Sequence, residues 1–274
     1  ESRDVGRVSA TVTDAKTGTV YVEANYEFSR LEAETPDQPK SNLDKTSSFS
    51  KDASSPIVVV TGGNGGVGQA LTDLLGDKAL GVSRIQTPKN LLVPDLEKIS
   101  QALGTQKVSS IVHCAWPAPD NAAFSTLADP ISAIEHSVAV PLRQIQALAS
   151  TLISNGAENA TLVLIGSTAA LPGRHNYRMP LYTLSKSLIP TLARILAMEL
   201  APYGKRCVGI EFDIIDGGMS GSLSRVATAA HEDRSPHGTI PSTKEAAEQI
   251  NWVMENASTL VSGATITLSG GAVP

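Results

Sequence analysis

The stretch that most constrains the fold runs from residue 58 to residue 71 and reads VVVTGGNGGVGQAL. Its apolar run predicts a strand buried on both faces that ends at Val60, because a half-exposed strand would alternate apolar with polar residues. A helix is predicted to begin near Gly68, and its N-terminus would attract anions through free N–H groups and the helix dipole. Gly62 permits a tight turn, Gly66 lets the backbone approach a phosphate, and Gly68 lets the helix lie close to the strand.

The segment from residue 56 to residue 274 repeats this change from strand to helix several times. Alternating strand and helix signals favour a parallel sheet with helices on both faces. We therefore predict an α/β fold with a doubly wound, Rossmann-type parallel sheet. The predicted strands read IVVV, ALGVS, NLLVP, SSIVHCA, ATLVLIG, CVGIEFDII and ATITLSG.

Residues 1–30 follow a different pattern. Polar and apolar residues alternate over residues 8–14 and 19–28, on either side of a turn that ends at Gly18, which predicts a β-hairpin extension. Residues 31–55 are polar and contain several prolines and serines, so we interpret them as a partly mobile linker. Residues 1–55 as a whole have two equal interpretations, a decorative extension and a functional part.

Composition excludes several classes of function. The 274 residues are 41% hydrophobic and 18% charged, as in ordinary globular proteins, and the net charge is −5 without a long basic run. Nucleic acid and anionic membranes are therefore not expected as partners. No apolar stretch reaches the ~18 residues that a membrane span needs. Cys114 and Cys207 lie in apolar runs, so we expect buried thiols, no metal site and a cytoplasmic protein.

The glycine turn has the spacing Thr-Gly-x-x-x-Gly-x-Gly and resembles that of the short-chain dehydrogenase/reductase family. The resemblance extends from about Ile57 to Gly271 and implies a nicotinamide dinucleotide as cofactor. Ser83 and Arg84 follow the second strand where NAD-dependent members carry an acid, and a guanidinium suits the 2′-phosphate of NADP(H). The alternative is that Arg84 is an ordinary surface charge. The residues expected to bind the cofactor are Gly62, Asn64, Gly66, Val67, Gly68, Ser83, Arg84, Asp95, Leu96, Ala115, Lys186 and Ile215.

Asp95 and Leu96 follow the third strand, where the resemblance implies contacts with the adenine, although Asp95 could instead cap a helix. Ile215, after the sixth strand, would offer its backbone to the nicotinamide carboxamide. At the end of the fourth strand the family's Asn-Asn-Ala-Gly is replaced by His-Cys-Ala-Trp, so that Ala115 alone is retained. We interpret the histidine at 113 as a buried structural residue. Trp116 either walls the nicotinamide pocket or fills the core.

The candidate catalytic residues centre on Tyr182 and Lys186. Their spacing of four places both side chains on one face of a predicted helix. A tyrosine loses its proton near pH ~10, and a neighbouring ammonium group is expected to lower the pKa of Tyr182 so that it can exchange a proton with a carbonyl oxygen. By resemblance, Ser167 at the end of the fifth strand would position that oxygen. Ser137 occupies the place of the family's relay asparagine, and His136 is expected to point elsewhere.

These observations predict an NADP(H)-dependent reductase or dehydrogenase that acts on a ketone/secondary alcohol pair, with a 3-oxoacyl thioester as the favoured substrate, free or carrier-bound. The alternatives are a catalytically weak or inactive NADP(H)-binding scaffold protein and a non-redox enzyme on the same fold. Residues 219–240 are polar and glycine-containing and are expected to form a lid loop or a disordered surface loop. The apolar helix over residues 180–200, which Pro190 could bend, predicts a homo-oligomer, either a dimer or a tetramer.

Overall fold

The computed structural model describes residues 5–13, 20–29, 55–84, 90–93, 95–118 and 122–272, which fall into two units that are taken separately. In the first unit, strand β1 (Val5–Thr13) pairs antiparallel with strand β2 (Val20–Ser29). The predicted turn between them and residues 31–54 of the predicted linker lie outside the described residues. The alternation of residues therefore corresponds to two paired strands, each close to its predicted range.

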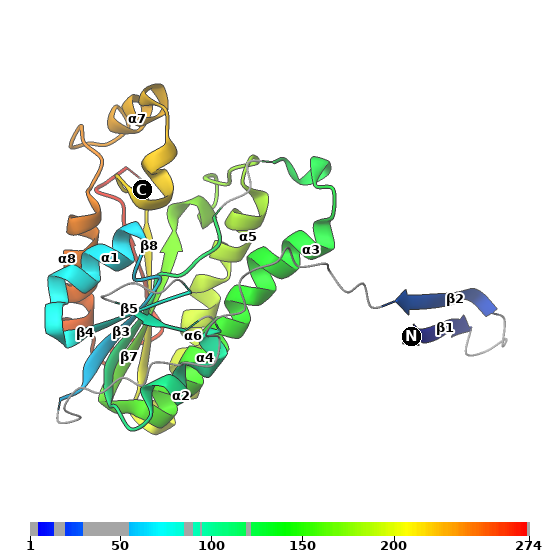
Figure 1. The fold of residues 1–274 in the computed structure, drawn as a ribbon. Helices are drawn as coiled ribbons and strands as arrows, with labels where there is room; N and C mark the ends of the chain where they lie inside the picture. Colours follow the sequence, from blue (N-terminus) through cyan, green and yellow to red (C-terminus); the bar gives the residue numbers. More distant parts are fainter. Residues whose placement is uncertain are drawn as a thin grey trace, which may run out of the picture. The chain divides into compact units, whose positions relative to one another are not determined.

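The second unit contains a seven-stranded parallel sheet, as the sequence predicts (Figure 1). The strands lie in the order β5-β4-β3-β6-β7-β8-β9, so the chain builds outward from β3 in one direction and then crosses to build outward in the other. Their bounds are β3 Ile57–Thr61, β4 Ala79–Ser83, β5 Asn90–Leu92, β6 Val108–His113, β7 Gly156–Ser167, β8 Arg206–Phe212 and β9 Thr265–Leu268.

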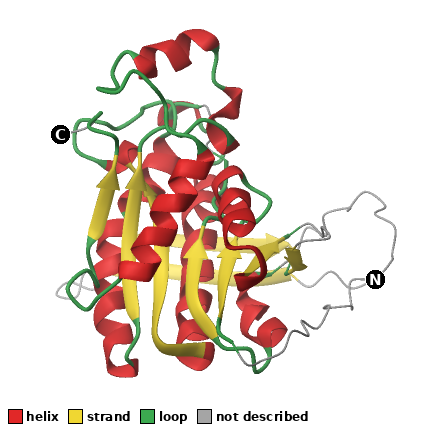
Figure 2. Cartoon of the chain, turned by 90° about the vertical axis from the view of Figure 1, so that its left-hand side faces the viewer, coloured by secondary structure: helices red, strands yellow, loops and turns green. Residues whose placement is uncertain are grey.

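Helices cover both faces of this sheet (Figure 2). Helices α1 and α8 pack on one face, and α2, α4 and α6 pack on the other. Helix α5 follows β7, and α3 precedes α4. The helix bounds are α1 Gly66–Leu75, α2 Ile99–Leu103, α3 Pro130–Ile134, α4 Val140–Asn155, α5 Pro180–Ser187, α6 Ile189–Leu200, α7 Arg225–Glu232 and α8 Thr243–Asn256.

The unbroken apolar strands explain the two cores. In β3, Val59 contributes to the core under α4 and α6, whereas Val60 contributes to the core under α1 and α8. The neighbouring strand β6 divides in the same way between Ile111 and Val112. Successive side chains of a strand point to opposite faces, so a strand covered on both sides needs apolar residues at every position.

The predicted long helix over residues 180–200 is divided in two. Helix α5 ends at Ser187, and α6 begins at Ile189. Pro190 lies in the first turn of α6, where a missing N–H has no helical acceptor to lose, and it cannot continue the hydrogen-bond ladder of α5. The division lets α5 lie at the carboxyl end of β7 while α6 packs on the sheet.

Candidate active site

An open cleft of about 1400 Å³ lies along the carboxyl ends of the parallel strands. It extends from the glycine turn after β3 past the ends of β4, β6, β7 and β8, which is where open α/β sheets bind their ligands. The predicted cofactor residues that line it are Gly62, Asn64, Gly66, Val67, Gly68, Ser83, Arg84, Ala115, Lys186, Leu96 and Ile215.

The glycine turn is closed to larger side chains at three positions. Gly62 has a φ of 71°, a left-handed conformation that favours glycine. A Cβ on Gly68 would lie 2.3 Å from the carbonyl oxygen of Gly62, and one on Gly66 would lie 2.7 Å from the backbone of Gly218. Helix α1 therefore starts tightly against the turn, and its N-cap residue, Gly65, provides no side-chain cap for the first N–H groups. Uncapped N–H groups at the start of a helix suit an anion.

The end of β4 supplies polar groups to the same side of the cleft. The Asn64 side chain donates a hydrogen bond of 2.9 Å to the Ser83 hydroxyl, and the adjacent Arg84 is exposed at the cleft wall. Leu96 is buried and lines the cleft. Among the described residues, Asp95 is not part of the lining; it is exposed, and its carbonyl accepts from the Lys98 amide.

His113 ends β6 and is fully buried, as predicted for a structural histidine. Its Nδ1 atom lies 2.9 Å from the Thr61 hydroxyl, which also accepts a hydrogen bond from the Ala115 amide. Burial, assisted by the charge of Lys186, lowers the pKa of His113 to about 3. The histidine is therefore neutral at physiological pH and joins the ends of β3 and β6.

Tyr182 and Ser167 both line the cleft. Tyr182 lies on α5 and Ser167 at the end of β7, and the Ser167 side chain is close enough to the phenol to influence its pKa. Burial raises the pKa of Tyr182, while the Ser167 side chain acts in the opposite direction. The expectation of a lowered tyrosine pKa is therefore wrong, because burial outweighs any stabilisation of the phenolate.

Lys186 is buried one turn beyond Tyr182, with 2% of its surface exposed. Its Nζ atom donates a 2.7 Å hydrogen bond to the Ile165 carbonyl and lies 5.7 Å from the centre of the Tyr182 ring. Burial lowers the pKa of Lys186 to about 7. A Cys114 thiolate would raise the pKa of Lys186. Burial raises the pKa of the Cys114 thiol to about 12, so this thiol is neutral near pH 7 and places no negative charge beside Lys186.

In the segment before α4, the residue that lines the cleft is His136 and not the predicted Ser137, one position later. Residues Glu135–Ala139 form a π-helical turn, and such turns often occur at functional sites. Ser137 is 8% exposed and, among the described residues, is not part of the cleft lining. The adjacent His136 is part of that lining. The expectation that His136 points elsewhere is therefore wrong, because the extra residue of a π turn rotates the helix face.

A polar cluster that the sequence analysis missed lies at the end of β8. The Asp213 carboxylate accepts a 2.8 Å hydrogen bond from Thr168 and two bonds, of 3.1 and 3.2 Å, from Arg174. All three residues line the cleft. Asp213 follows the apolar run of β8 directly in the sequence, but only the fold brings the loop after β7 within reach of it.

Residues 219–240 are not one loop. A short 3₁₀ turn spans Gly218–Ser222, and α7 follows with Ser224 as its N-cap, whose hydroxyl accepts from the Ala227 amide. His231 on α7 lines the cleft, and so do residues of the preceding turn. The prediction of an irregular loop is wrong here, although the segment does border the cleft as expected of a lid.

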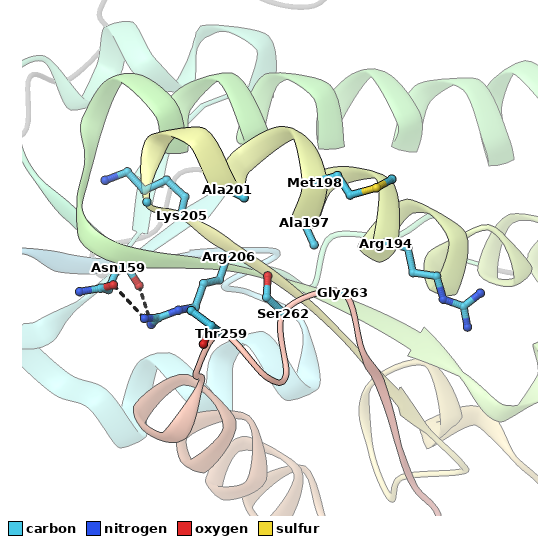
Figure 3. Close-up of a pocket in the computed structure, with 11 residues that line it drawn as sticks. Asn159, Arg194, Ala197, Met198, Ala201, Lys205, Arg206, Thr259, Ser262 and Gly263 are labelled. Atoms are coloured by element: carbon cyan, nitrogen blue, oxygen red, sulfur yellow. Dashed lines mark hydrogen bonds between the residues drawn. The ribbon is translucent and has the colours of Figure 1, made fainter.

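A second cavity, of about 520 Å³, lies where β8 begins, at the opposite end of the strands (Figure 3). Two of its three cationic side chains are bound to oxygen atoms of the chain: Lys205 donates to the Gly156 and Ala157 carbonyls, and Arg206 donates to Asn159. These bonds give Lys205 and Arg206 a structural role. The cleft at the carboxyl ends of the strands contains the predicted site residues, so it remains the candidate active site.

The described part of the chain can also be searched for a disulfide, a metal site and a membrane-spanning helix. Within it, Cys114 and Cys207 are both free, and no group of three or more histidine, cysteine or acidic residues could hold a metal ion. None of the described helices is long and apolar enough to cross a membrane.

Comparison with known proteins adds to this geometry. A family model described as "Enoyl-(Acyl carrier protein) reductase" matches residues 96–273, more than half of the chain. L-xylulose reductase from Bos taurus is 26% identical over 240 residues, which cover 78% of this chain and 94% of that protein. An uncharacterized oxidoreductase, YmfI of Bacillus subtilis (strain 168), is 23% identical over 242 residues, which cover 78% and 97%.

Solved structures show the same fold. A short-chain dehydrogenase/reductase from Brucella melitensis superposes with a TM-score of 0.70 at 22% identity, covering 80% of this chain and 97% of its own. A 3-ketoacyl-(acyl-carrier-protein) reductase from the same organism, solved with NADH, has a TM-score of 0.67 at 19% identity, with coverages of 81% and 99%. At these identities the likeness concerns the architecture of the chain.

Proposed function

Because the chain belongs to the short-chain dehydrogenase/reductase family, a family of oxidoreductases, we propose that it is an NADP(H)-dependent reductase of ketones. The observation that carries this proposal is the meeting of Tyr182, Ser167 and Lys186 in one cleft with the glycine turn. Each of the three has the chemistry that carbonyl reduction requires: a proton donor, a hydroxyl that orients an oxygen, and a cation.

The residues of the cleft fit a dinucleotide. The tight start of α1 at Gly66 and Gly68 leaves backbone N–H groups for a pyrophosphate. Arg84, with Ser83 and Asn64 beside it, would hold the 2′-phosphate of NADP(H), since a guanidinium binds phosphate oxygens with paired hydrogen bonds. When bound, the nicotinamide would supply the hydride that reduces the carbonyl carbon.

The chain's own groups would handle the oxygen of the substrate. Burial keeps the pKa of Tyr182 high, so its phenol stays protonated at neutral pH and can donate a proton to that oxygen. The Ser167 hydroxyl, which lines the same cleft, would orient the same oxygen. The charged form of Lys186 would stabilise the phenolate that remains and bind the ribose hydroxyls.

The proposed substrate is a ketone, with a 3-oxoacyl thioester, free or carrier-bound, as the first compound to assay. The description of the matching family model and the name of the Brucella melitensis reductase support this choice. The reduction of L-xylulose by the bovine relative, as its name states, supports adding sugars to the assay.

Tyr182→Phe tests the proposed role of the phenol. We expect kcat for NADPH oxidation with the active ketone to fall by about 10²- to 10⁴-fold, the usual contribution of a general acid, while NADPH binding changes little. Tyr177→Phe is the matched control, because Tyr177 is an exposed phenol in the same cleft lining without a lysine four residues later. If Tyr182→Phe keeps most of the activity, Tyr182 is not the proton donor.

A further inference from the structure

Trp116 lies between the end of β6 and helix α5 in a fixed orientation. Its Nε1–H donates a 3.1 Å hydrogen bond to the hydroxyl of Ser185, which is 1% exposed. That hydroxyl in turn donates a 3.0 Å bond to the Tyr182 carbonyl, so its donor and acceptor capacities are both used. The ring also packs on the core under α4 and α6 and lies 5.6 Å from the His113 ring, tilted by 58°.

The face of this indole covers the Lys186 ammonium. The Nζ atom lies 3.7 Å from the ring centre, well inside the distance at which an aromatic face attracts a cation. The Ile165 carbonyl provides the hydrogen-bond acceptor, and no carboxylate forms an ion pair with Lys186 in the described part of the chain. In the free protein the indole is thus a principal source of negative potential at this buried amine.

From these contacts we propose that Trp116 is the positioning residue of Lys186: its indole face holds the ammonium in place and favours its charged form. The inference deepens the proposed function, because Lys186 is the cation of the reductase site. It also explains the replacement of glycine by tryptophan in the His-Cys-Ala-Trp segment, since a glycine would leave the buried amine without this partner. The sequence left open whether Trp116 walls the pocket or fills the core. In the structure it lines the cleft and also packs on the core.

The charge of Lys186 can be followed without any substrate. Burial lowers its pKa to about 7, so the amine changes charge within an accessible pH range. The neighbouring His113 and Cys114 have pKa values of about 3 and about 12, and that of Tyr182 is raised, so these groups do not titrate between pH 5 and pH 9. On the π turn that packs on α5, the charged or titratable residues are His136 and Glu135, and Glu135 is exposed and paired with Arg143.

The chain has two tryptophans, and Trp252 is exposed on α8, away from the cleft lining. In a Trp252→Phe, His136→Gln background, Trp116 is therefore the single fluorescent indole, and the histidine of the π turn is removed. We expect its emission, recorded without cofactor from pH 5 to pH 9, to show one transition near pH 7 that disappears on adding Lys186→Met. Emission that is constant with pH, or a transition that survives Lys186→Met, would overturn the proposal even if the protein is a reductase.

Two replacements separate positioning from core filling. Trp116→Phe keeps an aromatic face, whereas Trp116→Leu removes it. The proposed reductase activity needs the charged form of Lys186. The rate of NADPH oxidation should therefore fall as the pH rises through the pKa of that amine. We expect Trp116→Leu to move this fall about one pH unit lower, and Trp116→Phe to move it less. If Trp116 only fills the core, both variants will lower thermal stability and leave the pH profile in place, which contradicts the proposal.

Discussion

At the scale of single residues, His113 shows how a buried titratable group ties the site to the stability of the fold. It joins β3 to β6 through Thr61, and its Nε2 atom has no hydrogen-bond partner among the described residues. A protonated imidazolium would place a second charge beside Lys186 in a buried position. The low pKa of His113 is the consequence of this arrangement.

We expect His113 to make the protein sensitive to acid. An unfolded histidine has a pKa near ~6.5, and the folded value is about 3, so between these values the unfolded chain binds more protons. The contribution of His113 is therefore fully present above pH 6.5 and decreases as pH falls toward 3. Relative to pH 7, protonation of the unfolded histidine lowers the free energy of unfolding at pH 4.5 by about 2 to 3 kcal/mol, since each pKa unit corresponds to about 1.4 kcal/mol.

His113→Asn removes this titration and keeps a side chain able to bond to Thr61. Urea unfolding at pH 7 and pH 4.5 should show a smaller loss of stability in the variant than in the parent protein. Equal losses in both proteins would show that His113 is not the acid-sensitive group.

The sequence predicted which residues line the cleft better than it predicted the direction of their pKa shifts. The spacing of Tyr182 and Lys186 is visible in the sequence, but the burial that raises one pKa and lowers the other depends on the whole fold. The π turn that exchanges His136 for Ser137 at the cleft has no signal in residue periodicity. Arg174 reaches the cleft through its tertiary contact with the end of β8.

At the scale of elements, the strands of the parallel sheet were predictable because each is an apolar run bounded by turn residues. Helix α7 was missed because its residues are mostly small or polar and none of them is buried in the core. Its N-cap serine and the alanines that follow were the available signal. The predicted turn at residues 14–19 and the predicted linker at residues 31–54 lie outside the described residues, so both stay predictions.

The α5–α6 segment presents apolar side chains that its own chain leaves exposed. Ile195 and Met198 lie about one turn apart on α6, Leu184 lies on α5, and each of the three is more than a third exposed. Scattered exposed apolar residues are ordinary, but a row along one helical segment is typical of a surface that another copy covers. We therefore propose that the protein is a dimer or tetramer that uses this segment.

The double variant Ile195→Glu, Met198→Glu should reduce the mass of the particle in light scattering, because burying two carboxylates at an interface is unfavourable. Val226→Glu on α7 adds a charge at another exposed apolar position and should leave the mass unchanged. A parent protein that is monomeric at all concentrations would contradict the proposed assembly.

At the scale of the whole molecule, the cleft results from the topology of the sheet. The chain leaves β3 for α1 and β4 on one side and crosses to β6 on the other, so the glycine turn and the His113–Trp116 segment face each other across the point where the strand order reverses. Helices α5 and α7 then close the cleft from the ends of β7 and β8. Residues from several elements of the larger unit thus meet at one edge of its sheet.

Transfer of deuterium from NADPH labelled at C4 of the nicotinamide tests the central claim most directly. With a panel of ketones that includes a 3-oxoacyl thioester, we predict that one product gains one mass unit at the carbinol carbon, and more slowly when labelled NADH replaces NADPH. Tight binding of NADPH without deuterium in any product would contradict the account and would favour a cofactor-binding scaffold protein on the same fold.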